Sequence, residues 1–238
     1  SPVDPPALFQ ASLDLRAALG ARLQGPMQAL LKRCRSGWDR SWPDGQGERQ
    51  LTAVAWSWLV AAGHQESRQQ ALEAVSGSSM TLARAALRAL HPIACHERDQ
   101  ASAVFFDRWQ NKPVILDSWF AQEASMPRPD GLDRVQALMQ HPRFDPLAPN
   151  SLRAVLGGFA ANVLVFHAEG GEGYRFMAEQ IAAVDQRNPV TASRMAKVFS
   201  RWRSYGQQRQ QEMQAAIEAL ASFELSTNTR EVVSMLLA

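Results

Sequence analysis

Residues 189–223 read PVTASRMAKVFSRWRSYGQQRQQEMQAAIEALASF, and the spacing of their apolar residues indicates the fold class of the chain. Apolar residues recur every three or four positions in both of its halves: Ala192, Met195, Phe199 and Trp202, then Met213, Ile217 and Leu220. Because a helix advances about 100° per residue, this spacing predicts one apolar face on each half. Tyr205-Gly206 lies between the two patterns. The stretch therefore predicts two amphipathic helices joined by a short turn.

The same pattern extends along the rest of the chain. Alanine, leucine, glutamine, glutamate and arginine, which favour helices, dominate the sequence, and β-branched residues rarely run together. Turn residues recur about every 15 to 20 positions, so two intervals give a unit of about 40 residues, as in helical-hairpin repeats. We expect an all-α fold, a superhelical stack of short antiparallel helix pairs of the HEAT or armadillo type. Residues 1–238 are predicted to form a single helical-repeat domain, with a possible division at the loop 36–48.

Composition limits the classes of protein to consider. The longest apolar runs, 53–62 and 160–166, are far shorter than the roughly 20 residues of a membrane span. Cys34 and Cys95 are too few for a disulfide framework, which indicates a reducing cytoplasm. A net charge of +2 is too small to mark the whole chain as a nucleic-acid binder. Residues 1–6 resemble no secretory signal and lack a starting methionine, which suggests a piece of a longer protein.

Catalytic motifs are nearly absent from the sequence. The segment 96–100, HERDQ, begins like the H-E-x-x-H helix of zinc proteases but has Gln100 in place of the second histidine. His91, Cys95 and His96 offer three metal ligands without a fourth nearby. The segment 170–174, GGEGY, lacks the lysine of a phosphate loop and is expected to be a turn between two helices. We therefore expect this chain alone to catalyse nothing and to hold no metal.

A basic stretch allows a different function. The stretch lies between Asp185 and Glu212 and contains no acidic residue. Its basic residues are Arg187, Arg194, Lys197, Arg201, Arg203 and Arg209. Such a helix could bind nucleic acid, with Trp202 and Tyr205 as stacking surfaces. A solvated basic face is the more frequent explanation and is favoured here.

Gly157-Gly158 raises a question of its own, since an interior glycine costs a helix about 1 kcal/mol relative to alanine. A helix beginning near Asn150 is expected to bury the stripe Leu152, Val155, Leu156, Phe159 and Val163. Arg153, Gly157 and Ala160 form an adjoining strip with little side-chain bulk. Such a strip either lets another helix approach closely or borders an open cavity that the guanidinium can reach. On spacing alone, close packing is favoured.

Several motifs resemble the C-terminal helical domain of bacterial aminopeptidase N, a zinc-dependent metallo-aminopeptidase. They are His141-Pro142-Arg143-Phe144, Ala148-Pro149-Asn150 with Arg153, Phe166-His167 with the segment 171–176 (GEGYRF), and Asp185 with Asn188-Pro189 and Arg194. The segment 116–124, LDSWFAQEA, and the helix start Met80-Thr81 are similar to the family as well. The resemblance runs from about Leu51 to the end of the chain.

The resemblance implies a domain that closes over the catalytic domain of an enzyme removing N-terminal amino acids from peptides. This chain would form the wall of the chamber above the zinc and would gate and orient peptides without catalysing the reaction. By motif position, Arg153 and Arg194 would bind the carboxylate end of the peptide. Its partners would be the catalytic and N-terminal domains of the same polypeptide and peptide substrates, with no nucleic acid and no membrane.

Two departures from the family are clear. The zinc-binding H-E-x-x-H helix and the Gly-x-Met-Glu-Asn segment, which belong to the family's catalytic domain, are not in this sequence, so zinc would be a cofactor of the full-length enzyme only. Ala148 replaces the first asparagine of the family's Asn-Pro-Asn, which affects only the helix cap. The alternative function is an independent helical-repeat scaffold that binds a protein partner; a basic nucleic-acid module ranks third.

Overall fold

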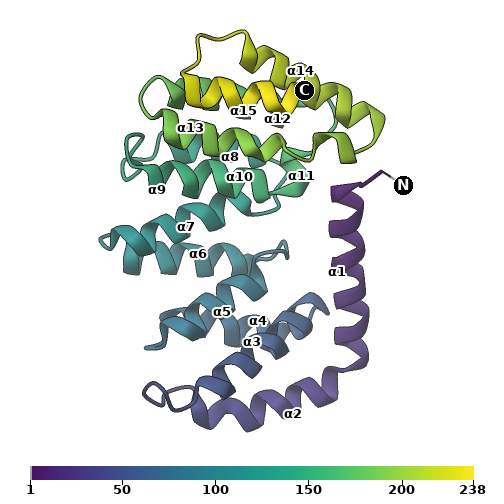
Figure 1. Cartoon of the computed structure of the whole chain (residues 1–238). Helices are drawn as coiled ribbons and strands as arrows, with labels where there is room; N and C mark the ends of the chain where they lie inside the picture. The colour runs from purple at the N-terminus through teal and green to yellow at the C-terminus, as the bar shows by residue number, and fades with distance from the viewer. Residues whose placement is uncertain (1) are drawn as a thin grey trace. The chain divides into compact units, whose positions relative to one another are not determined.

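The computed structural model describes residues 2–238, which form two compact units. The N-terminal unit comprises Phe9–Trp119, and the C-terminal unit comprises the residues up to Leu8 together with Phe120–Ala238. Helices α1 (Pro5–Arg22) and α7 (Pro113–Ser125) contribute residues to both units (Figure 1). Each unit consists of helices joined by short connections, which confirms the all-α prediction. Over residues 2–238, no helix combines the length and apolar character of a membrane span.

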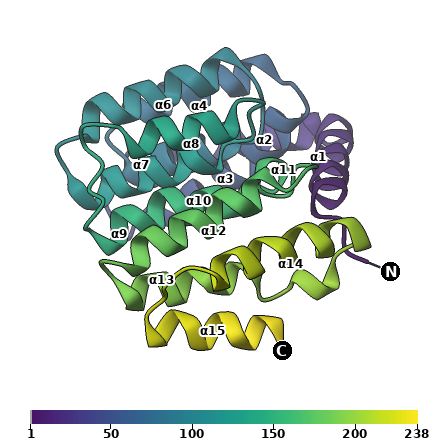
Figure 2. The ribbon, with the colours of Figure 1, turned by 90° about the horizontal axis from the view of Figure 1, so that it is seen from above.

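Consecutive helices of the N-terminal unit pack on one another. Besides parts of α1 and α7, this unit contains α2 (Gln24–Cys34), the 3-10 turn η1 (Arg35–Gly37), α3 (Gln46–Ala61), α4 (Gln65–Ser76), α5 (Met80–Leu90) and α6 (His96–Trp109). Helix α3 packs against α2, α4 and α5, and α4 also packs against α6 (Figures 1 and 2). Each helix thus buries its apolar face against the neighbours that precede and follow it, as expected for a helical repeat.

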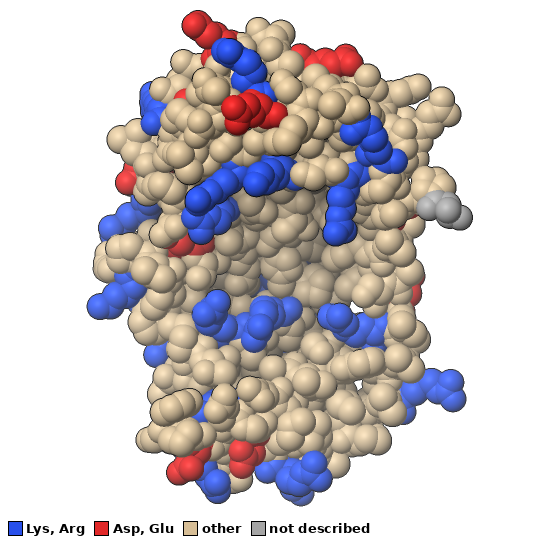
Figure 3. Space-filling model, in the orientation of Figure 1, with Lys and Arg blue, Asp and Glu red and all other residues tan. Residues whose placement is uncertain are grey.

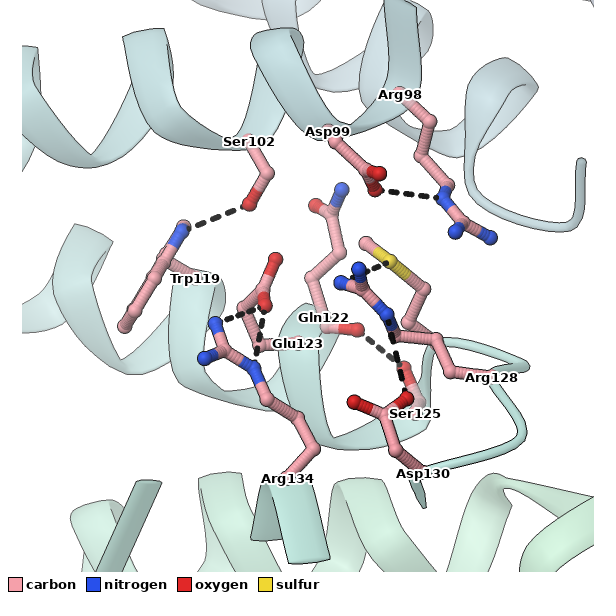
Figure 4. Close-up of polar contacts among 11 residues, drawn as sticks. Arg98, Asp99, Ser102, Trp119, Gln122, Glu123, Ser125, Arg128, Asp130 and Arg134 are labelled. Carbon is pink, nitrogen blue, oxygen red and sulfur yellow. Dashed lines mark hydrogen bonds and ion pairs between the residues drawn. The ribbon is translucent and has the colours of Figure 1, made fainter. Parts of the chain in front are cut away.

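The core of the N-terminal unit is built around α3 and α5. Trp56, Leu59 and Val60 of α3 are fully buried, and α5 presents buried alanines and leucines to them. Helix α7 begins at Pro113, a first-turn position that suits proline because the N–H it lacks would have no partner in the helix. Its Trp119 packs on Phe106 with 4.6 Å between the ring centroids, and the Trp119 indole donates a hydrogen bond to Ser102 Oγ at 3.0 Å (Figure 4). These contacts fix the first half of α7 against α6.

The predicted loop at 36–48 lies within the N-terminal unit. Arg49 of α3 is only 5% exposed, and its guanidinium donates hydrogen bonds to the carbonyl oxygens of Gly37, Arg40 and Asp44 at 2.9–3.0 Å. Because a buried guanidinium needs partners for its five N–H groups, Arg49 ties the loop to the helix that follows it. The single-domain organisation and the possible division at 36–48 stay predictions.

The C-terminal unit repeats the same architecture. It contains α8 (Gly131–Met139), α9 (Pro149–Leu152), the π-helical turn η2 (Arg153–Gly157), α10 (Gly158–Ala161), α11 (Val163–Phe166), α12 (Glu172–Asp185), α13 (Pro189–Ala196), the 3-10 turns η3 (Lys197–Phe199) and η4 (Trp202–Ser204), α14 (Gln207–Ala221) and α15 (Thr227–Leu237). Helix α12 packs against α13 and α14, and both of these pack against α15 (Figure 2). The core is aromatic, with Phe159 edge-to-face on Phe166 and Phe176 at centroid distances of 5.6 and 5.4 Å.

The junction of α12, α13 and α15 explains the Asp-x-x-Asn-Pro motif. Asn188 caps α13 by accepting a hydrogen bond from the Thr191 amide at 3.0 Å, and Pro189 occupies the first turn. Asp185 is 3% exposed and accepts hydrogen bonds from the Ser226 amide, the Ser226 hydroxyl and the Thr229 hydroxyl. Burial alone would raise the pKa of Asp185, but these hydrogen bonds hold it below its usual value. The carboxylate therefore anchors the start of α15 to the end of α12.

A buried ion pair connects α7 with α8 inside the C-terminal unit. Glu123 is 3% exposed, and its Oε2 accepts hydrogen bonds from Nε (3.0 Å) and Nη2 of Arg134 (Figure 4). The side-chain amide of Asn162 donates a hydrogen bond to the carbonyl oxygen of Met126, immediately after α7, at 2.8 Å. Breaking such a buried pair on one side leaves an uncompensated charge, so the Glu123–Arg134 pair fixes the position of α8 against α7.

Two helix predictions differ from the structure in detail. The pattern over 189–202 predicts one continuous helix, but α13 ends at Ala196, and two separate 3-10 turns follow it. The stripe predicted from Leu152 to Val163 is interrupted at Asn162, whose backbone is not helical (φ −79°, ψ 83°). The side chain of Asn162 is committed to the Met126 carbonyl, so Val163 starts a new short helix and is only half-buried.

Candidate functional site

The predicted site residue Arg153 lies in a π-helical turn. Residues Arg153–Gly157 form this turn between α9 and α10, where the backbone hydrogen bonds join residues five apart instead of the four of an α-helix. Ala154, Val155 and Leu156 of the turn are buried, whereas Arg153 and Gly157 are exposed. Single π turns occur frequently at functional sites because they reorient side chains without ending a helix. Here the turn keeps the apolar stripe in the core and directs Arg153 away from it.

The two glycines that follow have different roles. A Cβ on Gly158 would lie 2.6 Å from the carbonyl oxygen of Ala121 and 3.0 Å from Cβ of Ala124, so Gly158 permits close approach of α7. A Cβ on Gly157 would meet only Cγ of Arg153, at an ordinary 3.7 Å. Gly157 therefore borders open space. The strip of Arg153, Gly157 and Ala160 therefore borders an open pocket, and the close helix packing that spacing alone favoured for it is wrong; the close approach occurs at Gly158, outside the strip.

The second predicted residue, Arg194, lies in the last turn of α13 and is exposed. The helix cap at Asn188 and the first-turn proline fix where α13 begins. Ala192 and Ala196, on the opposite side of the helix, are fully buried, so the rotation of α13 is fixed as well. Arg194 is thus presented from a helix with a defined start and a defined buried face.

Arg153 and Arg194 line the same pocket of the C-terminal unit, with a volume of about 460 Å³. The lining comes from α9, η2, α10, α12, α13 with its cap residue, and η3, and consists of Pro149, Arg153, Leu156, Gly157, Ala160, Met177, Asn188, Val190, Thr191, Arg194, Met195 and Val198. Apolar side chains predominate, and the only charged groups are the two guanidiniums. The structure thus brings together the two arginines that the sequence separates by 41 positions.

The electrostatics of this pocket favour an anion. No acidic residue belongs to its lining, and no hydrogen bond or ion pair engages either guanidinium within the described part of the chain. Figure 3 shows lysine and arginine side chains gathered on the face of the C-terminal unit that carries α9, α10 and α13. A guanidinium that lacks a protein partner can bind a carboxylate through two parallel hydrogen bonds.

Sequence reasoning missed part of the lining. Met177 of α12 and Val190 and Val198 of the α13 segment face the pocket. Their spacing marks them as apolar positions of helices, but it does not say which helix lies opposite. Packing of α12 on α13 brings them to Arg194.

The Phe-His and Gly-x-Gly-Tyr motifs form a structural cluster. Nδ1 of His167 and the hydroxyl of Tyr174 lie 2.7 Å apart and share a hydrogen bond. Burial, followed by the nearby charge of Arg209, lowers the pKa of His167 to about 4. Burial also raises the pKa of Tyr174 well above its usual value. Both groups are therefore neutral at pH 7 and serve packing. The glycine-rich segment is confirmed as a turn, with Gly170 and Gly171 at positive φ before α12.

The basic stretch offers no aromatic stacking surface at Trp202. That ring is 7% exposed, its indole donates to the carbonyl of Leu236 at 2.9 Å, and the Arg203 guanidinium lies 4.3 Å from its centroid. Tyr205 packs edge-on against His167. Arg209 forms an ion pair with Asp4 at 3.4 Å. These residues serve packing and pairing, which weighs against the nucleic-acid function.

Metal ligands are not clustered in the described residues. Among residues 2–238, no three His, Cys, Asp or Glu side chains lie where they could share an ion. His96 starts α6, and Cys95 is free and precedes it. The residues present do not form a zinc site, so no metal-dependent step is assigned to them.

Comparison with known proteins identifies relatives of the whole chain. Residues 1–238 match a family model described as a domain of unknown function, DUF3458_C, with ARM repeats. The chain is 34% identical to aminopeptidase N of Caulobacter vibrioides over 97% of its length and 36% identical to aminopeptidase N of Escherichia coli over 68%. These alignments cover 27% and 19% of the relatives, so the chain spans about a quarter or less of their length.

A solved structure has the same fold. The chain superposes on an aminopeptidase A of Legionella pneumophila, crystallised in complex with aspartic acid, with a TM-score of 0.88 and 30% identity. The match covers 99% of this chain and 29% of that one. Sequence and structure comparisons therefore agree that the chain corresponds to one helical domain of much longer aminopeptidases.

Proposed function

Because the chain belongs to the DUF3458_C family of ARM-repeat domains, we propose that it is the non-catalytic helical domain of a zinc-dependent aminopeptidase N. In this proposal the domain forms part of the wall of the chamber over the active site and gates and orients peptides. The full-length protein removes N-terminal amino acids from peptides, and its zinc and catalytic residues belong to the catalytic domain. The two free cysteines, Cys34 and Cys95, support a cytoplasmic location.

Within that function, Arg153 and Arg194 bind the carboxylate end of the peptide. The observation that carries this assignment is their convergence on one pocket that contains no acidic residue. Apolar walls lower the local dielectric and strengthen the attraction between a guanidinium and a carboxylate. Arginine also suits this role because its planar fork matches both carboxylate oxygens. A peptide held at its far end presents its amino terminus to the catalytic domain in a restricted orientation.

Kinetics of the full-length enzyme test the proposal. We expect Arg153→Gln and Arg194→Gln each to lower kcat/KM for short peptides with a free carboxylate by about tenfold or more, because a charge-assisted hydrogen bond is lost. The same peptides with an amidated C-terminus should lose little. Arg201→Gln is the matched control, since Arg201 lies in the same basic stretch but outside the pocket lining.

Comparison of the kcat/KM losses on free-carboxylate and amidated peptides decides whether the arginines bind the carboxylate. Equal losses on free and amidated peptides would remove the carboxylate role of both arginines. An effect of Arg201→Gln as large as that of Arg194→Gln would reduce the site to a general positive charge. Full-length enzyme without aminopeptidase activity would refute the function itself.

A further inference from the structure

The pocket beside the two arginines is more apolar than carboxylate binding requires. Five of its lining side chains are large aliphatic or thioether groups, namely Leu156, Met177, Val190, Met195 and Val198, and Pro149 and Ala160 add smaller apolar surface. We propose that this apolar part of the pocket takes the side chain of the residue that carries the carboxylate, so that the domain selects peptides with an apolar C-terminal residue. This inference rests on the proposed function and adds a specificity to it.

The apolar part of the pocket has a fixed floor and an adjustable rim. Leu156 is fully buried and Met177 is 2% exposed, so the core holds both in place. Val190 is 50% exposed, and Met195 and Val198 are half-buried, which leaves their surfaces accessible to a ligand. Thioether side chains adapt to apolar groups of different shapes. The pocket therefore suits a class of side chains such as leucine, methionine, valine and phenylalanine.

The pocket is large enough to hold a terminal residue with its side chain. A volume of about 460 Å³ falls in the range of roughly 300–1,000 Å³ typical of small-molecule sites. The uncharged polar groups of the lining are Asn188, whose side-chain oxygen is already used as a helix cap, and Thr191. Apolar surface next to cationic groups matches an amino acid with a carboxylate and an apolar side chain.

Gly157 keeps this pocket open. It is exposed, and a Cβ at this position would meet only Cγ of Arg153, at 3.7 Å, so larger side chains fit the backbone without strain. A leucine at position 157 would project into the space that the ligand side chain needs. Gly157 is therefore the position at which the pocket can be closed without disturbing the core. Gly25 of α2 is a matched control, because a Cβ there would meet nothing within 4 Å.

Binding of small probes to the 238-residue chain tests the inference. The probes are N-acetyl-leucine, N-acetyl-glycine, N-acetyl-aspartate and N-acetyl-leucinamide, titrated while the amide resonances of the protein are followed by NMR. Because leucine buries an apolar side chain that glycine lacks, the affinity for N-acetyl-leucine should be higher than that for N-acetyl-glycine by about tenfold or more. Its shifts should map to η2 and α13. Gly157→Leu should remove this preference, and Gly25→Leu should retain it.

The probes separate the two claims. N-acetyl-leucinamide reports on the carboxylate: if it binds as tightly as N-acetyl-leucine, the proposed role of the arginines fails. N-acetyl-glycine reports on the side chain: if it binds as tightly as N-acetyl-leucine while the amide binds weakly, the arginines keep their role and the apolar specificity is refuted. Tighter binding of N-acetyl-aspartate than of N-acetyl-leucine would also overturn the apolar specificity.

Discussion

Gly157 and Gly158 are adjacent in sequence, yet alanine at the two positions should change stability in opposite directions. At Gly158 the added Cβ would lie 2.6 Å from the Ala121 carbonyl oxygen and 3.0 Å from the Ala124 Cβ. The obstacle includes backbone, which cannot rotate away, so α7 and α10 must move apart. At Gly157 the added Cβ would make only an ordinary contact with Arg153.

The magnitudes follow from two opposing terms. Alanine stabilises a helical position by up to about 1 kcal/mol relative to glycine. Overpacking a well-filled interface typically costs about 1–3 kcal/mol. For Gly158→Ala the second term exceeds the first, so the free energy of unfolding should fall by about 1–2 kcal/mol. For Gly157→Ala only the first term applies, so the free energy of unfolding should rise by about 0.5 kcal/mol. This is less than the full preference for alanine because the position lies in a π turn.

Urea unfolding followed by far-ultraviolet circular dichroism measures both changes. The unfolding midpoint should shift down for Gly158→Ala and slightly up for Gly157→Ala, with unchanged slopes. Because the two positions are adjacent in the sequence, each variant serves as the control for the other. Equal effects of the same sign would refute the claim that one glycine packs against α7 and the other borders an open pocket.

Two further predictions concern buried titratable groups. Asp185→Ala removes the acceptor of three hydrogen bonds from Ser226 and Thr229, so it should lower the free energy of unfolding by about 3 kcal/mol; thermal unfolding would measure this. Because the folded pKa of Asp185 is lowered, its stabilisation is present above the unfolded pKa of 3.8 and is lost as the pH falls through the folded value. As the pH falls below about 3.8, the free energy of unfolding should therefore decrease less for the Asp185→Ala variant than for the wild type. The pKa of His167 is about 4 in the folded chain, compared with 6.5 for an unperturbed histidine, so the folded state resists protonation of this side chain. Stability should fall by roughly 3 kcal/mol between pH 6.5 and 4, because the unfolded chain binds the proton first. His167→Gln should flatten this dependence, and an unchanged pH profile would show that His167 does not titrate as stated.

Local sequence patterns predicted the helices well but not their interruptions. Period-3.6 spacing placed Leu152, Val155, Leu156 and Phe159 in the core, where the structure has them. The break at Asn162 depends on the carbonyl of Met126, 36 positions away, and no local pattern contains that information. The π turn at Arg153–Gly157 was not predicted either, because the apolar spacing across it is that of an ordinary α-helix.

The candidate site could be predicted in part. Motif resemblance pointed to Arg153 and Arg194, which line one pocket in the structure. The apolar surface beside them could not be predicted, because it arises where α12 packs on α13. Met177 is an unremarkable helix position until that packing is known. The long-range ion pair of Asp4 with Arg209 was missed for the same reason.

A crystal structure of the protein with a bound free-carboxylate peptide ending in leucine would show whether the two arginines hold the peptide carboxylate. We expect carboxylate oxygens about 2.7–2.9 Å from guanidinium nitrogens of Arg153 or Arg194, with the leucine side chain against Met177 and Met195. A carboxylate bound elsewhere, with both guanidiniums left in solvent, would contradict this expectation.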